Sequence, residues 1–167
     1  AFVALAVTER VMADDAAFGV ALSHVWPSPF AEAAVEVTRR AVSALGITEG
    51  PSSTQLRLSS GGPEVIGVAA RLGGGHEAEL IEAVTGIGLN ELALSAALGD
   101  APVPGTVART PGHRPGGAVT RFLLAPPGVL ESVEVPQGMS GVAAVRVYRQ
   151  PGHLFESAGR AADPAGA

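Results

Sequence analysis

The stretch that decides the fold is STQLRLSSGGPEVIGVAARLGGGH, which covers residues 53–76. Polar and apolar side chains alternate over 53–59, which indicates a strand, and the apolar run 64–70 indicates a second strand. The segment Gly61-Gly62-Pro63 separates the two runs, and these residue types favour a tight turn. The sequence therefore predicts a β-hairpin that leads directly into a glycine loop at 73–75.

Helical patterns flank this hairpin on both sides. Apolar residues recur at helical spacing over 30–45, with Ser28 as the expected N-cap and Gly46 as the expected stop. Shorter helical patterns follow the glycine loop at 77–85 and 89–98. Runs rich in Val, Phe and Leu predict further strands at 2–7, 18–26, 118–125, 129–135 and 142–149. We therefore expect an α+β fold in which helices back an antiparallel sheet, with a small β domain attached.

Composition divides the chain into four parts. Residues 1–100 form the expected main lobe, and 101–117 read as a linker because they are rich in Pro and Gly. Residues 118–157 form the expected small β domain, and the Ala/Gly/Pro tail 158–167 is expected to be flexible.

The composition excludes several classes of partner and site. The 167 residues carry a net charge of −5 and no Lys, so no basic surface for nucleic acid is expected. No apolar run approaches the ~20 residues that a membrane helix needs. The absence of Cys excludes disulfides and thiolate sites and fits a reducing compartment, so we expect a cytoplasmic protein. Because the chain does not begin with Met, we expect it to be part of something longer.

The hairpin and its glycine loop resemble the C-terminal lobe of the ATP-grasp ligases. The resemblance extends to the segments Ser23-His24-Val25-Trp26-Pro27, Ala44-Leu45-Gly46-Ile47, Gly50-Pro51, Thr85-Gly86-Ile87 and Ala97-Leu98-Gly99. Within that superfamily the chain most resembles the carboxylate–amine ligases of the L-amino-acid ligase type. In those enzymes a small C-terminal β domain follows, and 119–157 is similar to it.

The resemblance implies an activity in which ATP phosphorylates a carboxylate and an amine then attacks the acyl phosphate to give an amide. Such phosphoryl transfer needs Mg²⁺ held by oxygen ligands. The resemblance places the first metal ligand on Gln55 and the second ligand position on Gly67. It makes Arg71 the catalytic arginine that steadies the transferred phosphoryl group. It also implies that His24 contacts the substrate and that the backbone at Gly74 and Gly75 approaches the ATP phosphates.

The sequence departs from the family pattern at three of these positions. Gln55 stands where this branch usually has Glu, and Gly67 has no side-chain oxygen. Ala21 stands where the amino-acid ligases carry a Glu that receives the substrate amine. Glu64 does not replace Gly67, because a strand residue three positions away is expected to face the opposite side.

Three interpretations follow from this mixture of kept and lost residues. The first is the C-terminal part of a ligase whose lysine-bearing N-terminal lobe lies elsewhere, so that the isolated chain is inactive. ATP and small carboxylate and amine molecules are its expected partners, and a homodimer stays open. The second is a degenerate, non-catalytic binding or scaffold module, which Gly67 and Ala21 favour. In the third, an unrelated α+β domain, Arg71 is an ordinary surface arginine, His24 is structural and the glycine loop is only a turn.

Overall fold

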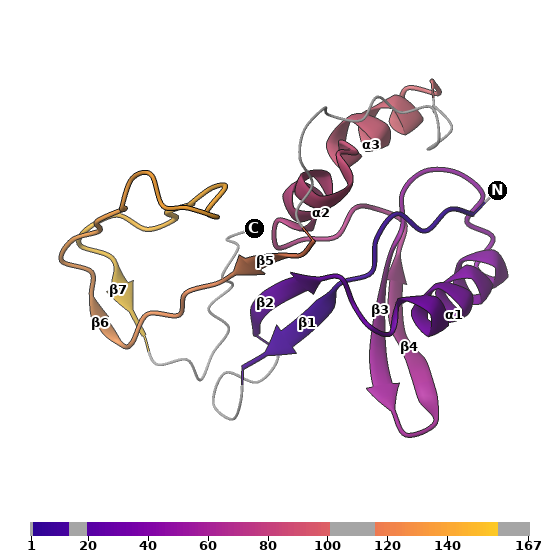
Figure 1. Cartoon of the computed structure of the whole chain (residues 1–167), viewed down its shortest axis with the longest axis horizontal. Helices are drawn as coiled ribbons and strands as arrows, with labels where there is room; N and C mark the ends of the chain where they lie inside the picture. The colour runs from indigo at the N-terminus through magenta and orange to yellow at the C-terminus, as the bar shows by residue number, and fades with distance from the viewer. Residues whose placement is uncertain (1, 14–19, 101–115, 157–167) are drawn as a thin grey trace. The chain divides into compact units, whose positions relative to one another are not determined.

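The structure, a computed structural model, describes residues 2–13, 20–100 and 116–156 (Figure 1). Two compact units make up the chain: one is Ala1–Val11 with Ser23–Arg121, and the other is Met12–Leu22 with Phe122–Ala167. The expected tail and nearly all of the expected linker lie outside the described residues.

The expected hairpin is the central element of the first unit. As predicted, strand β3 (Ser53–Ser59) pairs antiparallel with β4 (Gly62–Ala69), and Gln55 lies opposite Gly67. The register shifts after Gln55, because Leu56 lies opposite Val65. Ile66 is therefore an extra residue on β4, and the hairpin contains a β-bulge.

Helix α1 (Ala31–Ala44) packs against β4, and Figure 1 shows the helix alongside the hairpin. Residues alternate along β3: Thr54 and Leu56 are half-buried, whereas Gln55 and Arg57 are exposed. The helix therefore covers one face of the hairpin and leaves the face with Gln55 open.

The ends of α1 follow from local chemistry. The N-cap residue is Phe30, so the expectation that Ser28 is the N-cap is wrong. The Ser28 hydroxyl instead accepts a hydrogen bond of 3.2 Å from the backbone N–H of Phe30. After the helix, Gly46 adopts a left-handed φ of +68°, which glycine tolerates without steric cost. The prediction of a helix over 30–45 is confirmed within one residue at each end.

A three-stranded sheet has the order β1-β2-β5, formed by β1 (Glu9–Met12), β2 (Ala21–Trp26) and β5 (Ala118–Arg121). In this sheet β2 and β5 are antiparallel, with His24 opposite Thr120. The strand expected at 2–7 is wrong, since the N-terminal strand lies at 9–12. Strand β5, which the sequence analysis places in the small β domain, falls within the first unit.

Two short helices follow the glycine loop at the expected positions. Helix α2 (Glu77–Thr85) contacts both β5 and α3 (Leu89–Ala97). This region supplies much of the buried core, namely Leu80 and Val84 of α2, Ile87 between the helices and Leu89 of α3.

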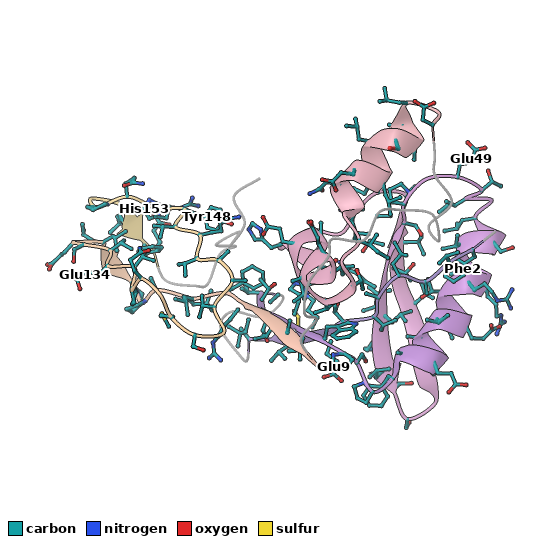
Figure 2. The ribbon with its side chains drawn as sticks, turned by 45° about the horizontal axis from the view of Figure 1, so that its top comes forward. Phe2, Glu9, Glu49, Glu134, Tyr148 and His153 are labelled. Atoms are coloured by element: carbon teal, nitrogen blue, oxygen red, sulfur yellow. The ribbon has the colours of Figure 1, made fainter. Side chains whose placement is uncertain are left out.

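The second unit contains a two-stranded ladder between β6 (Gly128–Val129) and β7 (Leu154–Phe155). The rings of His153 and Phe155 pack edge to face, with their centroids 4.8 Å apart. Figure 2 labels Glu134, Tyr148 and His153 among the side chains of this unit. The strand expected at 142–149 is absent from the described residues, and the one at 129–135 is reduced to the end of β6. The alternation of apolar residues predicts strands there, but a strand also needs a neighbouring strand to pair with, and outside β6 these segments have none among the described residues.

The mixed α+β fold that the sequence predicts is thus present. Within the described residues, no helix is long and apolar enough to cross a membrane.

Candidate functional site

The open face of the hairpin carries the two expected metal-ligand positions. Gln55 and Gly67 are opposite each other, and both are exposed. A Cβ added at Gly67 would meet nothing within 4 Å, and its φ lies outside the left-handed range. A neighbouring side chain therefore does not explain the glycine, and the position has room for a larger residue.

The bulge corrects the expected direction of Glu64. Glu64 lies opposite Arg57, and Arg57 lies two residues from Gln55, so these residues share one face. The extra residue Ile66 lets Glu64 and Gly67 share that face although three positions separate them. The expectation that Glu64 faces away from Gly67 is therefore wrong.

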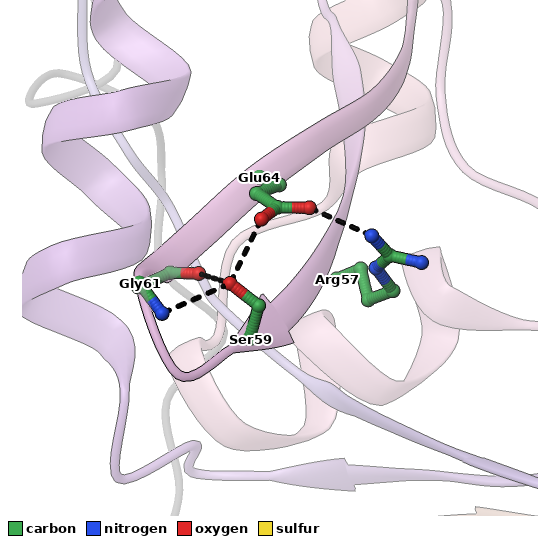
Figure 3. A network of polar contacts seen from close by, with 5 residues as sticks. Arg57, Ser59, Gly61 and Glu64 are labelled. Carbon is green, nitrogen blue, oxygen red and sulfur yellow. Dashed lines mark hydrogen bonds and ion pairs between the residues drawn. The ribbon is translucent and has the colours of Figure 1, made fainter.

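The carboxylate of Glu64 is already engaged in a network at the hairpin end (Figure 3). It accepts hydrogen bonds of 2.8 Å from the Arg57 guanidinium and 2.8 Å from the Ser59 hydroxyl. The hydrogen bond from Arg57, and after it the one from Ser59, lowers the pKa of Glu64 below its ordinary value. Glu64 therefore serves the turn and does not point a free carboxylate at Gln55.

Arg71 follows the open end of the hairpin, two residues after β4 ends at Ala69. Its side chain is exposed, and Nη1 donates a hydrogen bond of 2.7 Å to the Leu72 carbonyl. Arg71 thus lies at the same end of the hairpin as Gln55 and Gly67. Its remaining donors are able to meet an anion there.

The three glycines of the loop that follows Arg71 in the sequence lie in different environments. A Cβ at Gly73 would collide with the Glu77 carboxylate and come within 3.2 Å of the Ser53 hydroxyl. A Cβ at Gly74 would meet nothing within 4 Å, whereas Gly75 has a left-handed φ of +62°. The loop is therefore packed at its first residue, open at its second and restricted in conformation at its third.

His76 continues the left-handed backbone, with a φ of +59°, and caps the start of α2. Such a conformation is unusual for a residue with a side chain. The ring Nδ1 lies 2.5 Å from a carboxylate oxygen of Glu79, one turn further along. This contact holds His76 at the end of the loop.

His24 lies on β2 and is buried, with 7% of its surface exposed. Its Nδ1 is 3.0 Å from Oε1 of Glu77, the first residue of α2. This contact is an ion pair when the imidazole is protonated. Sequence reasoning found His24 and the glycine loop but missed Glu77, which touches both.

The described residues do not form a magnesium site by themselves. No group of three or more His, Asp or Glu side chains among them has a metal-binding arrangement. Gln55 offers one neutral oxygen, Gly67 offers none, and the Glu64 carboxylate is bound to Arg57. Mg²⁺ is usually held in proteins by one or two carboxylates together with substrate phosphates, so this donor set does not fit it.

A second feature that sequence reasoning missed is an open hollow of about 250 Å³ in the first unit. It is mainly apolar and is lined by the segment 4–7 together with Trp26, Pro27, Ser28, Ala31 and Val35.

Comparison with known proteins gives a likeness of structure. No family model and no curated protein sequence matches the chain. Phosphoribosylglycinamide synthetase from Anaerococcus prevotii matches 90% of the chain with a TM-score of 0.72 and 16% identity. L-amino acid ligase from Bacillus licheniformis matches 84% of it with a TM-score of 0.63 and 26% identity. The chain spans 39% and 36% of the lengths of these two proteins, respectively.

Both proteins are ATP-grasp carboxylate–amine ligases, the group that the sequence motifs resemble. Over most of its length, this chain therefore has the fold found in part of the ATP-grasp carboxylate–amine ligases.

Proposed function

We propose that the chain is the C-terminal part of an ATP-dependent ligase that joins a carboxylate to an amine through an acyl phosphate. The pairing of Gln55 with Gly67 across a hairpin that runs into Arg71 and the glycine loop is the observation that carries this proposal. The likeness to an L-amino acid ligase at 26% identity supports it.

Each proposed site residue has a role that its chemistry allows. Arg71 is the catalytic residue, whose guanidinium balances charge on the transferred phosphoryl group. The backbone N–H groups at Gly74 and Gly75 face the ATP phosphates, because glycine lets a backbone approach a ligand closely. His24 contacts the substrate, and Gln55 supplies one oxygen on the metal side of the site.

The proposal assigns the rest of the machinery to other parts of a longer protein. The chain has no Lys and spans 36–39% of the lengths of the two ligases. A lysine-bearing N-terminal lobe is the proposed partner, and a homodimer is a further prediction. Because the described donors do not fit Mg²⁺, we derive no step through the ion. The cytoplasm is the compartment that the proposal expects, in line with the absence of Cys.

The expected domains remain part of the proposal in a modified form. The main lobe would then include β5, and the small β domain would begin after it. The linker at 101–117 and the tail at 158–167 stay as sequence-based predictions.

The test joins the chain to a lysine-bearing nucleotide lobe and measures phosphate release that depends on both a carboxylate and an amine. The 167-residue chain alone should show no turnover, and the joined protein should show turnover that Arg71→Ala lowers by at least 10²-fold, on the order expected for a lost transition-state contact. Arg40→Ala, an exposed arginine on α1, is the matched control. Turnover by the chain alone, or equal activity of the two arginine variants, would contradict the proposal.

A non-catalytic module is the second candidate, and two observations favour it. Gly67 has space for a ligand side chain but carries none. Ala21, which replaces the expected amine-binding Glu, is buried at 6% exposure within β2. In this case the joined protein binds ATP without releasing phosphate, so the same assay separates the two candidates.

A further inference from the structure

One carboxylate contacts two parts of the candidate site. Oε1 of Glu77 lies 3.0 Å from Nδ1 of His24, while Oε2 occupies the place where a side chain on Gly73 would begin. His24 belongs to β2, Gly73 belongs to the loop, and Glu77 opens α2. The two oxygens of a single side chain therefore link β2 to a stretch far from it in the sequence, the glycine loop and the start of α2.

The burial of this contact makes it stronger than a surface pair. The His24 side chain is 8% exposed, its Nδ1 is closed to solvent, and the Glu77 side chain is 23% exposed. Water screens such a pair less than it screens a pair on the surface. Neighbouring segments also carry titratable groups, namely Arg121, which follows the partner of His24 on β5, and the pair of His76 with Glu79 at the start of α2.

We propose that Glu77 is a positioning residue that fixes both the tautomer of His24 and the place of the glycine loop. A carboxylate beside Nδ1 favours the tautomer with its proton on that nitrogen. Nε2 then carries the lone pair of the neutral ring. Gly73 is glycine because the carboxylate of Glu77 needs the space of a Cβ.

The role of these contacts in ligation rests on the proposed function, but the contacts themselves do not. The test therefore uses the 167-residue chain without nucleotide or metal. The His24 ring is observed by two-bond ¹H–¹⁵N NMR at about pH 9, where an ordinary imidazole is neutral. The spectrum of His24→Gln, which lacks one ring, identifies the His24 signals.

Four variants separate positioning from simple structural loss. Glu77→Ala removes the acceptor, so His24 should shift toward the tautomer with its proton on Nε2. Glu77→Gln keeps an acceptor oxygen and should retain the parent tautomer. Gly73→Ala displaces the carboxylate and should resemble Glu77→Ala. Gly74→Ala is the matched control, since a Cβ there meets nothing, and should resemble the parent.

The proposal is overturned if folded Glu77→Ala keeps the parent tautomer, or if Gly73→Ala and Gly74→Ala give the same His24 spectrum. If Glu77→Ala does not fold, the two glycine variants and Glu77→Gln decide the question by the same criteria. If the joined protein released no phosphate in the ligase assay, the expected His24 spectra of these variants would be the same. The two proposals therefore fail separately.

Discussion

At the scale of single residues, the Thr54 side chain buries a hydroxyl group without a hydrogen bond in the described part of the chain to offset the loss of water. Its hydroxyl oxygen is buried on the α1 side of β3 and has no hydrogen-bond partner among the described residues. Valine has nearly the same shape and no polar atom to desolvate. Where a buried polar atom lacks a partner, replacing it with an apolar group removes a cost.

We therefore expect Thr54→Val to raise the free energy of unfolding by about 1 kcal/mol, the usual size of such an effect. Urea denaturation of the parent and the variant measures the difference. Thr120→Val on β5 is the control and should bring no gain, because the Thr120 hydroxyl is not a buried atom without a partner. A loss of stability in Thr54→Val would show that its hydroxyl does have a partner.

Gly67 leads to the second residue-scale prediction. The position is exposed, has an ordinary φ and leaves room for a side chain, so Gly67→Glu should fold without strain. The new carboxylate lies opposite Gln55 and adds the charged oxygen that the donor set lacks. We expect the variant to melt at or slightly above the temperature of the parent and to gain saturable Mg²⁺ binding.

Mg²⁺ titration with amide NMR of the hairpin measures this gain. Val119→Glu adds the same charge on exposed β5 and should gain no site. If Gly67→Glu and Val119→Glu respond alike to Mg²⁺, residue 67 does not occupy a metal-ligand position.

At the scale of elements, the end of the β3–β4 hairpin depends on an ion pair that pH controls. The hydrogen bond from Arg57, with a smaller one from Ser59, holds the pKa of Glu64 below the ordinary 4.5. A lowered pKa in the folded state means that the ionised carboxylate stabilises the fold above about pH 4.5. This contribution is lost as the pH falls through the lowered value.

Glu64→Gln should therefore melt below the parent at pH 7, and the difference should disappear near pH 2. The effect is small because the pair is exposed to solvent. Thermal melts across this range measure it, with Glu49→Gln as the control, an exposed carboxylate with no ion pair among the described residues. A difference that persists in acid would mean that Glu64 acts through packing and not through its charge.

The elements that the sequence predicts well are those that local chemistry determines. The hairpin and the helices at 31–44, 77–85 and 89–97 follow from turn residues, caps and periodicity within short windows. The strand at 9–12 and the pairing of β2 with β5 depend on distant partners, which no local pattern reveals. A glycine inside a strand is typical of a bulge, so Gly67 could have indicated the reversal of Glu64.

The residues of the candidate site also divide into those that the local sequence predicts and those that depend on distant contacts. The sequence predicts that Gln55 and Gly67 lie on adjacent strands with Arg71 near the same end, but their direct pairing also depends on the bulge at Ile66. Glu77 meets His24 only because α2 lies against the sheet that contains β2, so its role required coordinates. The roles of these residues remain predictions.

At the scale of the whole molecule, the two units differ in how much they bury. The first has a core that includes Ala34, Val42, Leu80 and Val84. Over 122–156, in the second unit, no residue is buried. Several apolar side chains of this stretch are largely exposed, including Leu123 at 87%, Val129 at 61% and Leu154 at 57%. A stretch of this length without a core, disulfide or metal is too small to be stable by hydrophobic burial.

Hydrogen exchange of the 167-residue chain tests this difference directly. Amides in α2 and in the β3–β4 ladder should be protected, because both elements combine backbone hydrogen bonds with packed neighbours. Amides over 131–149 should exchange close to the rate of an unfolded chain, whereas the flanking ladder of β6 with β7 should give brief protection. Leu80→Ala, which removes a core side chain of α2, should accelerate exchange in the first unit and leave 131–149 unchanged. Slow exchange over 131–149 in the parent chain would show that this stretch has a core of its own. That result would contradict the exposure of its apolar side chains in the structure.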